Sequence, residues 1–197
     1  MPSETKRVGL FGGSFDPPHI CHLLSSIYLL ETTDLSAIWW LPVHRHAFRK
    51  GDRLASWESR LAMCSAVAEQ HRGIEVEPIE AELGPTNFAI DTIGALRDRH
   101  PETEFSWIIG SDLLEELPRW HRWPELRDSV RFVVVGRGPA DALLPEGGRF
   151  DLRDFTLPDV SSTQVRRLLA AGRDGEARRF VPGPVASWLE QHPEHYR

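Results

Sequence analysis

The chain has 197 residues, of which 41% are hydrophobic and 26% charged, and its formal net charge is −6. A chain of this length suits one globular domain, and none of its apolar runs approaches the roughly 20 residues that span a bilayer. The acidic balance argues against broad binding to nucleic acid or to an anionic membrane, which needs a basic surface, but it leaves room for a small anionic ligand.

Strand-like and helix-like segments alternate along the chain. This alternation implies right-handed crossovers and a mainly parallel sheet with helices on both faces. We therefore predict an α/β fold, a doubly wound Rossmann-like sheet in a single domain that covers residues 1–197. Ligands of such sheets bind beyond the carboxyl ends of the strands. The predicted strands are 7–11, 37–41, 74–78, 104–109, 131–135 and the more polar 151–156, and the predicted helices are 18–31, 57–70, 90–99, 162–171 and 184–191.

The first strand is followed by the sequence GGSFDPPHICH, which begins at Gly12. Gly12 and Gly13 remove side chains where the backbone leaves the strand, so a ligand can approach the main chain closely. Asp16 is the expected N-cap of the next helix, with Pro17 or Pro18 at its first position. The stretch predicts a tight turn that leads into a helix N-terminus.

His19 and His22 lie three residues apart in this stretch and share one face of the first helical turns. A helix N-terminus offers free N–H groups and partial positive charge to a phosphate. A solvated turn and a metal site are the alternatives, but no third or fourth metal ligand is evident nearby. The sequence favours phosphate binding, with both imidazoles as hydrogen-bond donors.

A second helix start, SSTQVRRLL, lies near the other end of the chain. Ser161 or Ser162 can cap this helix, and the hydroxyls of Ser162 and Thr163 flank its free N–H groups. Arg166 follows on the same face, and a guanidinium suits phosphate oxygens. Ordinary capping is the alternative reading. The stretch predicts a second anion site, and we expect the two helix starts to converge.

Two further stretches follow predicted strands. Gly110 and Asp112 end the fourth strand, where a carboxylate either binds ribose hydroxyls or caps a turn. The loop 44–50 holds the densest positive cluster of the chain, so it is either a solvated loop or a contact for an anionic phosphate.

Four motifs together resemble those of the HxGH nucleotidyltransferases, and the chain as a whole resembles the nicotinate (or nicotinamide) mononucleotide adenylyltransferases. The resemblance covers nearly the full length. It is carried by GGSFDPPHICH at 12–22, NFAIDT at 87–92, WIIGSD at 107–112 with Trp120 further on, and VSSTQVR at 160–166.

This resemblance implies transfer of the AMP moiety of ATP to nicotinate mononucleotide, with Mg²⁺ carried by ATP and no protein metal site. Trp120 is preferred to Trp123 as the pyridine contact because of its distance from Asp112. Relatives are often dimers or larger, which leaves a homo-oligomer open. The implied catalytic residues are His19, His22 and Arg166; the ATP-binding residues are Gly12, Gly13, Ser14, Phe15, Cys21, Gly110, Asp112, Ser162 and Thr163; and the mononucleotide-binding residues are Phe88, Ala89, Trp120, and Arg49 or Lys50.

Some positions depart from the family pattern. Cys21 replaces the glycine expected close under the adenine, so we expect Cys21→Gly to improve the use of ATP. Phe88 and Ala89 replace Tyr and Thr, which leaves a nicotinamide-preferring enzyme as an alternative. A transferase with another acceptor, such as phosphopantetheine, and a non-catalytic nucleotide-binding protein are the remaining alternatives.

Two expectations complete the interpretation. The two cysteines do not make a disulfide framework and the N-terminus shows no export signal, so we expect a cytoplasmic protein. We also expect His22→Ala to lower turnover strongly while the melting temperature stays within a few degrees, because His22 opens an exposed helix.

Overall fold

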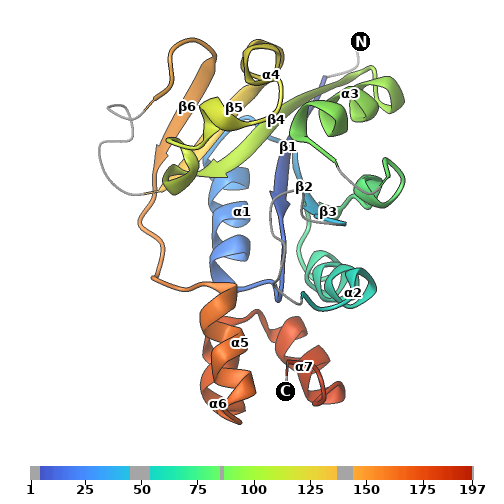
Figure 1. The fold of residues 1–197 in the computed structure, drawn as a ribbon, viewed down its shortest axis with the longest axis vertical. Coiled ribbons are helices and arrows are strands. Elements are labelled where there is room, and N and C mark those ends of the chain that lie inside the picture. The colour runs from blue at the N-terminus through green and yellow to red at the C-terminus, as the bar shows by residue number, and fades with distance from the viewer. Residues whose placement is uncertain (1–4, 45–53, 85–86, 137–143, 197) are drawn as a thin grey trace.

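The computed structural model describes residues 5–44, 54–84, 87–136 and 144–196. Its described strands form one parallel sheet in the order β3-β2-β1-β4-β5-β6 (Figure 1). The strand order reverses between β1 and β4, which is where the ligand crevice of such a sheet is expected. The strands are β1 (Lys6–Gly13), β2 (Ala37–Pro42), β3 (Ile74–Val76), β4 (Thr103–Gly110), β5 (Arg131–Gly136) and β6 (Arg149–Asp154).

Helices cover both faces of the sheet. Residues alternate between the two faces along β2: Ile38 and Trp40 enter one core cluster, while Trp39 and Leu41 enter the other. The first cluster also takes residues of α1, α2, α5 and α7, and the second takes residues of α3 and α4. The helices are α1 (Ile20–Thr32), α2 (Trp57–Ala68), α3 (Ala89–Arg99), α4 (Trp123–Ser129), α5 (Ser162–Ala170), α6 (Asp174–Ala177) and α7 (Gly183–Gln191), with 3-10 turns η1 (Ile79–Ala81), η2 (Ser111–Leu113), η3 (Leu117–Arg119) and η5 (Arg178–Phe180).

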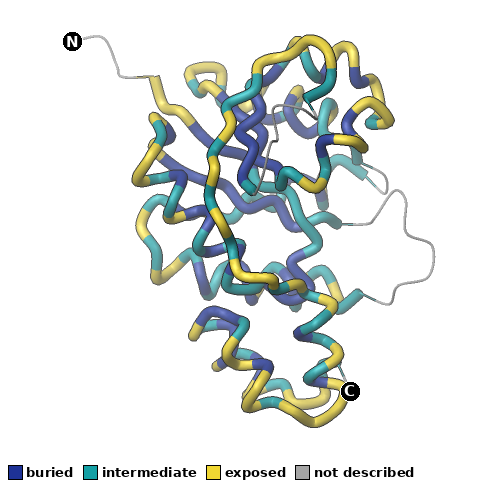
Figure 2. The backbone as a smooth tube through the Cα atoms, turned by 90° about the vertical axis from the view of Figure 1, so that its left-hand side faces the viewer, coloured by how far each residue is buried: buried dark blue, intermediate teal, exposed yellow. Residues whose placement is uncertain are grey.

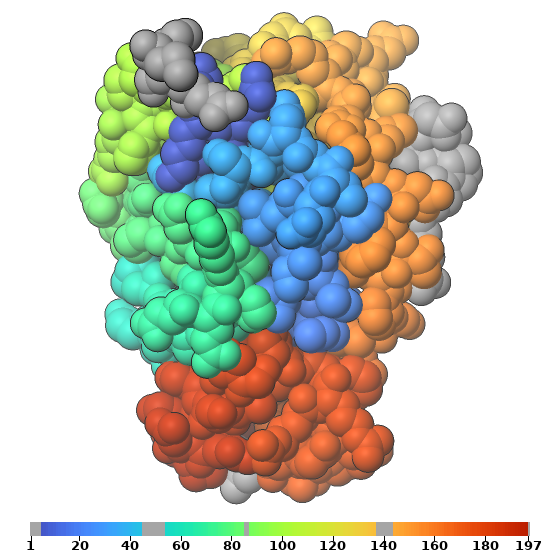
Figure 3. Space-filling model, turned by 180° about the vertical axis from the view of Figure 1, so that it is seen from behind, coloured from blue at the N-terminus to red at the C-terminus, as the bar shows by residue number. Residues whose placement is uncertain are grey.

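The C-terminal helices α5, α6 and α7 form a separate layer beyond the sheet (Figures 1 and 2). Figure 3 shows the same layer directly against the N-terminal end of α1 and beside the segment that contains α2. The layer is joined to the rest through apolar packing, since Val165, Val185 and Leu189 belong to the first core cluster. The C-terminal part of the chain therefore lies next to the turn that follows β1.

The predicted α/β fold is confirmed, including the sixth, polar strand. The third strand is shorter than expected, because it ends at Val76 and the chain continues into η1. The sequence analysis missed α4, whose seven residues include Pro124 and lie below the length at which helical periodicity is clear. None of the helices in the described part of the chain has the length and apolar character of a membrane span.

Candidate active site

Close packing disfavours a side chain at either glycine at the end of β1. A Cβ on Gly12 would lie 3.2 Å from the ring of Trp107 on the neighbouring strand, and one on Gly13 would lie 3.2 Å from the ring of Phe15. Phe15 takes a left-handed backbone conformation with φ 48° and stacks on Trp40, with 5.0 Å between ring centroids. The turn after β1 is therefore built around an inward-pointing phenylalanine.

Asp16 is not the N-cap of α1, contrary to the sequence prediction. The helix begins at Ile20 and its N-cap is His19. The Asp16 side chain is fully buried, and its Oδ1 accepts hydrogen bonds from the Ala55 main-chain N–H (3.1 Å) and the Tyr196 hydroxyl (2.8 Å). A buried carboxylate needs donors, and these distant groups supply them better than a local cap would. Asp16 thus anchors the turn to the rest of the protein.

The two histidines form a capping arrangement at the start of α1. The His19 main-chain N–H donates to Nδ1 of His22 at 3.0 Å, and the ring centroids are 3.8 Å apart. Because Nδ1 of His22 is an acceptor, the neutral ring carries its proton on Nε2. The ring also lies against Phe15, with 4.7 Å between centroids. His22 is half-buried, so the expectation of an exposed helix opening is wrong.

Burial sets the charge of this pair. It lowers the pKa of His19 to about 4, and it lowers the pKa of His22 well below its ordinary value, with the neighbouring His19 adding to the effect. Both imidazoles are therefore neutral at pH 7. They offer N–H donors to a ligand rather than positive charge.

The start of α5 contacts the turn after β1. Ser161 caps α5 by accepting from the Gln164 N–H at 3.2 Å, and the Ser162 hydroxyl donates to the Pro17 carbonyl at 2.9 Å. Nη1 of Arg166 donates to the Asp16 carbonyl at 2.7 Å and lies 3.4 Å from Oδ2 of the same residue. The turn that leads into α1 thus meets the start of α5 across 145 residues of sequence.

Thr163 and Cys21 add to the same contact region. Nη2 of Arg166 donates to Oγ1 of Thr163 at 3.3 Å, which fixes the guanidinium along α5. The Cys21 thiol is buried and donates to the Pro158 carbonyl at 3.3 Å, and burial raises its pKa. The thiol therefore faces the segment that leads into α5.

The end of β4 lies beside the end of β1, because the two strands are paired. A Cβ on Gly110 would lie 2.2 Å from Oδ1 of Asp112, so the carboxylate of Asp112 folds back over this glycine. Asp112 is exposed in η2. Trp120 is half-buried and meets Trp107 edge to face, with 6.5 Å between centroids. Trp123 is 6% exposed within the core, so Trp120 is the more accessible of these two tryptophans.

The start of α3 lies beside the same segment. Phe88 is the N-cap of α3 and its ring stacks on His121, with 4.1 Å between centroids. Ala89 is the first residue of the helix and is half-buried. Phe88, Ala89 and Trp120 are therefore brought to one region. Arg49 and Lys50 lie outside the described residues.

Arg60 of α2 is a functional candidate that the sequence analysis missed. Its guanidinium is 1% exposed and donates to the carbonyls of Ser14 (2.7 Å), Ala55 (3.1 Å) and His44 (3.5 Å). It ties the turn after β1 to the segments that follow β2. A lone arginine in a helical pattern is usually a surface residue, so no signal in the sequence identified it.

Glu80 of η1 lies on the other side of the same connection. It is 7% exposed, its Oε2 accepts from the His44 N–H at 3.3 Å, and burial raises its pKa to about 7. The main-chain carbonyl of Glu80 accepts from the side-chain amide of Asn87, which links it to the approach to α3. Sequence reasoning missed Glu80 and Arg60, and it also missed Tyr196, whose hydroxyl donates to Asp16.

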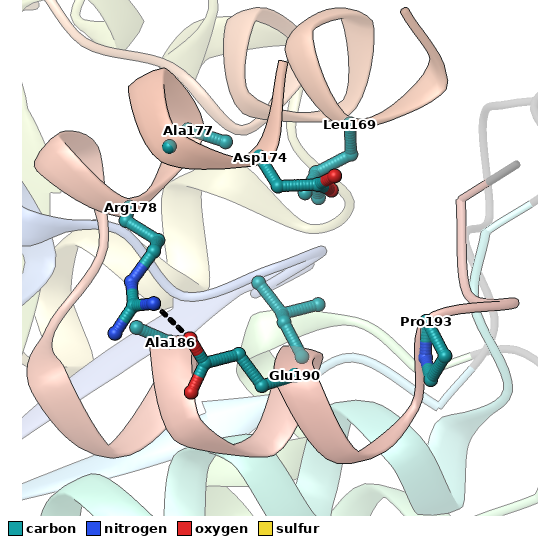
Figure 4. A pocket seen from close by; sticks show the side chains of 9 residues that line it. Leu169, Asp174, Ala177, Arg178, Ala186, Glu190 and Pro193 are labelled. Carbon is teal, nitrogen blue, oxygen red and sulfur yellow. Dashed lines mark hydrogen bonds and ion pairs between the residues drawn. The ribbon is translucent and has the colours of Figure 1, made fainter. Parts of the chain in front are cut away.

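A separate hollow of about 290 Å³ lies between α5, α6 and α7 (Figure 4). Leu169, Ala177 and Pro193 contribute apolar surface, and an ion pair joins Arg178 to Glu190. The hollow lies at the carboxyl end of α5, whereas the sequence motif occupies its N-terminal turn. None of the predicted site residues lines it.

Comparisons with known proteins agree with the motifs. Residues 10–168 match the profile of the family described as cytidylyltransferase-like. The chain is 38% identical, over 96% of both chains, to the "Probable nicotinate-nucleotide adenylyltransferase" of Anaeromyxobacter dehalogenans (strain 2CP-1 / ATCC BAA-258). It is 37% identical to the protein of the same name in Exiguobacterium sibiricum, over 94% of this chain and 96% of the relative.

Solved structures with a similar fold include the nicotinic acid mononucleotide adenylyltransferase of Plasmodium falciparum, complexed with NaAD. Its TM-score is 0.78 at 17% identity, over 96% of this chain and 98% of that one. The same protein complexed with APC gives a TM-score of 0.76 at 18% identity, over 97% of each chain. At this identity the likeness shows the fold alone, while the sequence matches show the family: the chain belongs to the cytidylyltransferase-like family.

Proposed function

We propose that this protein transfers the adenylyl group of ATP to nicotinate mononucleotide, giving deamido-NAD and pyrophosphate. The observation that carries the proposal is the contact between the turn that leads from β1 into α1 and the start of α5, made by Ser162 with Pro17 and by Arg166 with Asp16. Relatives at 38% and 37% identity named probable nicotinate-nucleotide adenylyltransferase support the choice of reaction.

The histidine pair and α5 form the proposed triphosphate site. In this proposal His19 and His22 donate N–H groups to the phosphates, and Arg166 steadies the leaving pyrophosphate. The neutral state of the imidazoles and the Nε2 proton of His22 support a donor role. Ser162 and Thr163 place hydroxyls at the same helix start. The turn residues Gly12, Gly13, Ser14 and Phe15, with Cys21, Gly110 and Asp112, are proposed to surround the adenosine.

The mononucleotide is proposed to bind between α3 and η3. Trp120 offers a half-buried indole for stacking on the pyridine ring, and such stacking is worth roughly 0.5–1.5 kcal/mol beyond area burial. The first turn of α3, at Phe88 and Ala89, offers main-chain N–H groups and a positive dipole end to the nicotinate carboxylate. Arg49 or Lys50 is proposed to contact the mononucleotide phosphate.

The proposed chemistry is an in-line displacement at the α-phosphorus. A phosphate oxygen of the mononucleotide forms the new P–O bond, and the bond from the α-phosphorus to the bridging oxygen of the β-phosphate breaks. Pyrophosphate leaves with that bonding pair. Both reactants are anions, so the protein's contribution is to orient them and to place donors where negative charge develops; each effect supplies several kcal/mol.

Mg²⁺ is proposed to enter with ATP, where it neutralises the phosphate oxygens. It needs few protein ligands when substrate phosphates hold it. The guanidinium and hydroxyl donors of the site suit phosphate oxygens. Within the described residues no group of three or more His, Cys, Asp or Glu side chains is placed to hold a metal ion. A cytoplasmic location is part of the proposal and is supported by two buried, unpaired cysteines.

Pyrophosphate release by the purified protein with ATP and Mg²⁺ tests the proposal. Nicotinate mononucleotide, nicotinamide mononucleotide and phosphopantetheine are supplied in turn as acceptors, and we expect turnover to be highest with the first. Arg166→Ala should lose most of this activity. The neighbouring Arg167 is exposed and provides the matched control, Arg167→Ala. No pyrophosphate with any acceptor would refute the proposal, and preference for another acceptor would change the assigned substrate.

A further inference from the structure

The C-terminal segment reaches back to the turn after β1. The hydroxyl of Tyr196 donates to Oδ1 of Asp16 at 2.8 Å, across 180 residues of sequence. The ring packs against the first core cluster, and its backbone has φ 69°, a left-handed conformation that non-glycine residues rarely adopt. A penultimate residue held in this way makes a defined contact with the proposed phosphate site.

Tyr196 acts on a carboxylate that also faces Arg166. Asp16 is fully buried, and its Oδ1 accepts from Tyr196 and from the Ala55 N–H. The other oxygen, Oδ2, lies 3.4 Å from Nη1 of Arg166, which also donates to the Asp16 main-chain carbonyl. Four segments thus meet at one aspartate: the turn after β1, the segment before α2, the N-terminal part of α5 and the C-terminal segment.

The phenol contributes a hydrogen bond without contributing charge. Burial and the nearby Asp16 carboxylate raise the pKa of Tyr196 well above its ordinary value, so the hydroxyl stays protonated and donates. A buried carboxylate with too few donors interacts more strongly with the nearest cation. The nearest cation on the site side is Arg166, which a bound triphosphate must share with Asp16. A neutral donor on Asp16 therefore leaves more of the charge of Arg166 for the ligand.

We propose that Tyr196 is a positioning residue for the triphosphate site: its hydroxyl donates to Oδ1 of Asp16, weakens the hold of that carboxylate on Arg166 and thereby frees Arg166 to bind phosphate. This inference rests on the proposed function, in which Arg166 contacts the phosphates of ATP. It predicts that loss of one hydroxyl at the end of the chain weakens ATP binding. Binding of the mononucleotide, at the start of α3, does not depend on this contact.

Isothermal titration of Tyr196→Phe with ATP and Mg²⁺, and separately with nicotinate mononucleotide, tests the proposal. We expect the Kd for ATP to rise about tenfold, equivalent to 1.4 kcal/mol, and the Kd for the mononucleotide to stay within about twofold. The chain has one other tyrosine, Tyr28, whose ring stacks on Phe155 away from Asp16. Tyr28→Phe is therefore the matched control and should bind both ligands as the wild type does.

A double-mutant cycle separates positioning from general loss of structure. In an Arg166→Gln background, which removes the charge that Asp16 and the ligand share, Tyr196→Phe should change the Kd for ATP by less than about twofold. Unchanged ATP binding in Tyr196→Phe, equal weakening for both ligands, or additive effects in the cycle would each overturn the inference. If the wild type binds ATP but these outcomes occur, only this inference fails. A wild type that binds no ATP would overturn the proposed function as well.

Discussion

Replacing His22 by alanine removes two separable contributions of one imidazole. The first is structural: the ring accepts the His19 main-chain N–H at 3.0 Å and packs against Phe15 and Phe11. A lost hydrogen bond of this kind costs about 1 kcal/mol, and truncation of a half-buried ring that makes aromatic contacts costs about 1 kcal/mol more. For a chain of this size about 2 kcal/mol corresponds to a fall of roughly 4–8 °C in Tm.

The second contribution is the Nε2 donor, which the tautomer fixed by His19 directs away from the capping bond. Loss of one donor placed at developing charge typically lowers turnover about 10²–10³-fold, and we expect this from His22→Ala. Glutamine is a usual residue at this third position of a capping box, so His22→Gln should restore part of the stability without restoring turnover.

Thermal denaturation and pyrophosphate release, measured on the same preparations, test both contributions. A His22→Ala protein with wild-type Tm would refute the structural argument. A His22→Gln protein with wild-type turnover would refute the donor argument. The exposed helix opening inferred from the sequence led to the expectation of a Tm within a few degrees of the wild type, and the burial of the ring is the reason that a larger fall is now expected.

Three further predictions follow from the buried groups. Arg60→Lys should lower the free energy of unfolding by about 2 kcal/mol, measured by urea denaturation, because one ammonium cannot replace a guanidinium on three carbonyls; an unchanged midpoint would contradict this. Burial raises the pKa of Glu80 to about 7 from an ordinary value of 4.5, so as the pH rises the unfolded chain releases this proton before the folded protein does. The wild type should therefore lose stability as the pH rises from 4.5 to about 7. Glu80→Gln, which keeps an acceptor for the His44 N–H, should abolish this loss of stability. If the free energy of unfolding of the two proteins varies identically with pH, Glu80 is not its cause. Cys21→Gly is still expected to lower the KM for ATP, and the lost contact with Pro158 adds a fall in unfolding free energy of about 1–2 kcal/mol; a KM that does not fall would show a pocket adapted to the thiol.

The sequence determined the fold and the location of the site. Alternating apolar segments specify a doubly wound sheet because its inner strands must be buried on both faces, as the residues of β2 show. The motifs at Gly12, Gly110 and Ser162 lie at strand ends or at a helix start. The topology of such a sheet brings these positions to one edge, so local signals were sufficient to place them there.

The tertiary structure decided how the individual side chains are used. Local capping rules predicted Asp16 as the N-cap of the helix, but its carboxylate is buried and accepts hydrogen bonds from Ala55 and Tyr196 instead. The same contacts explain why Tyr196 and Arg60 were not recognised: their partners lie 180 and 46 residues away in the sequence, and no periodic pattern encodes such pairs. Burial, which also sets the charge of the imidazoles, is a property of the assembled layers and not of any single segment.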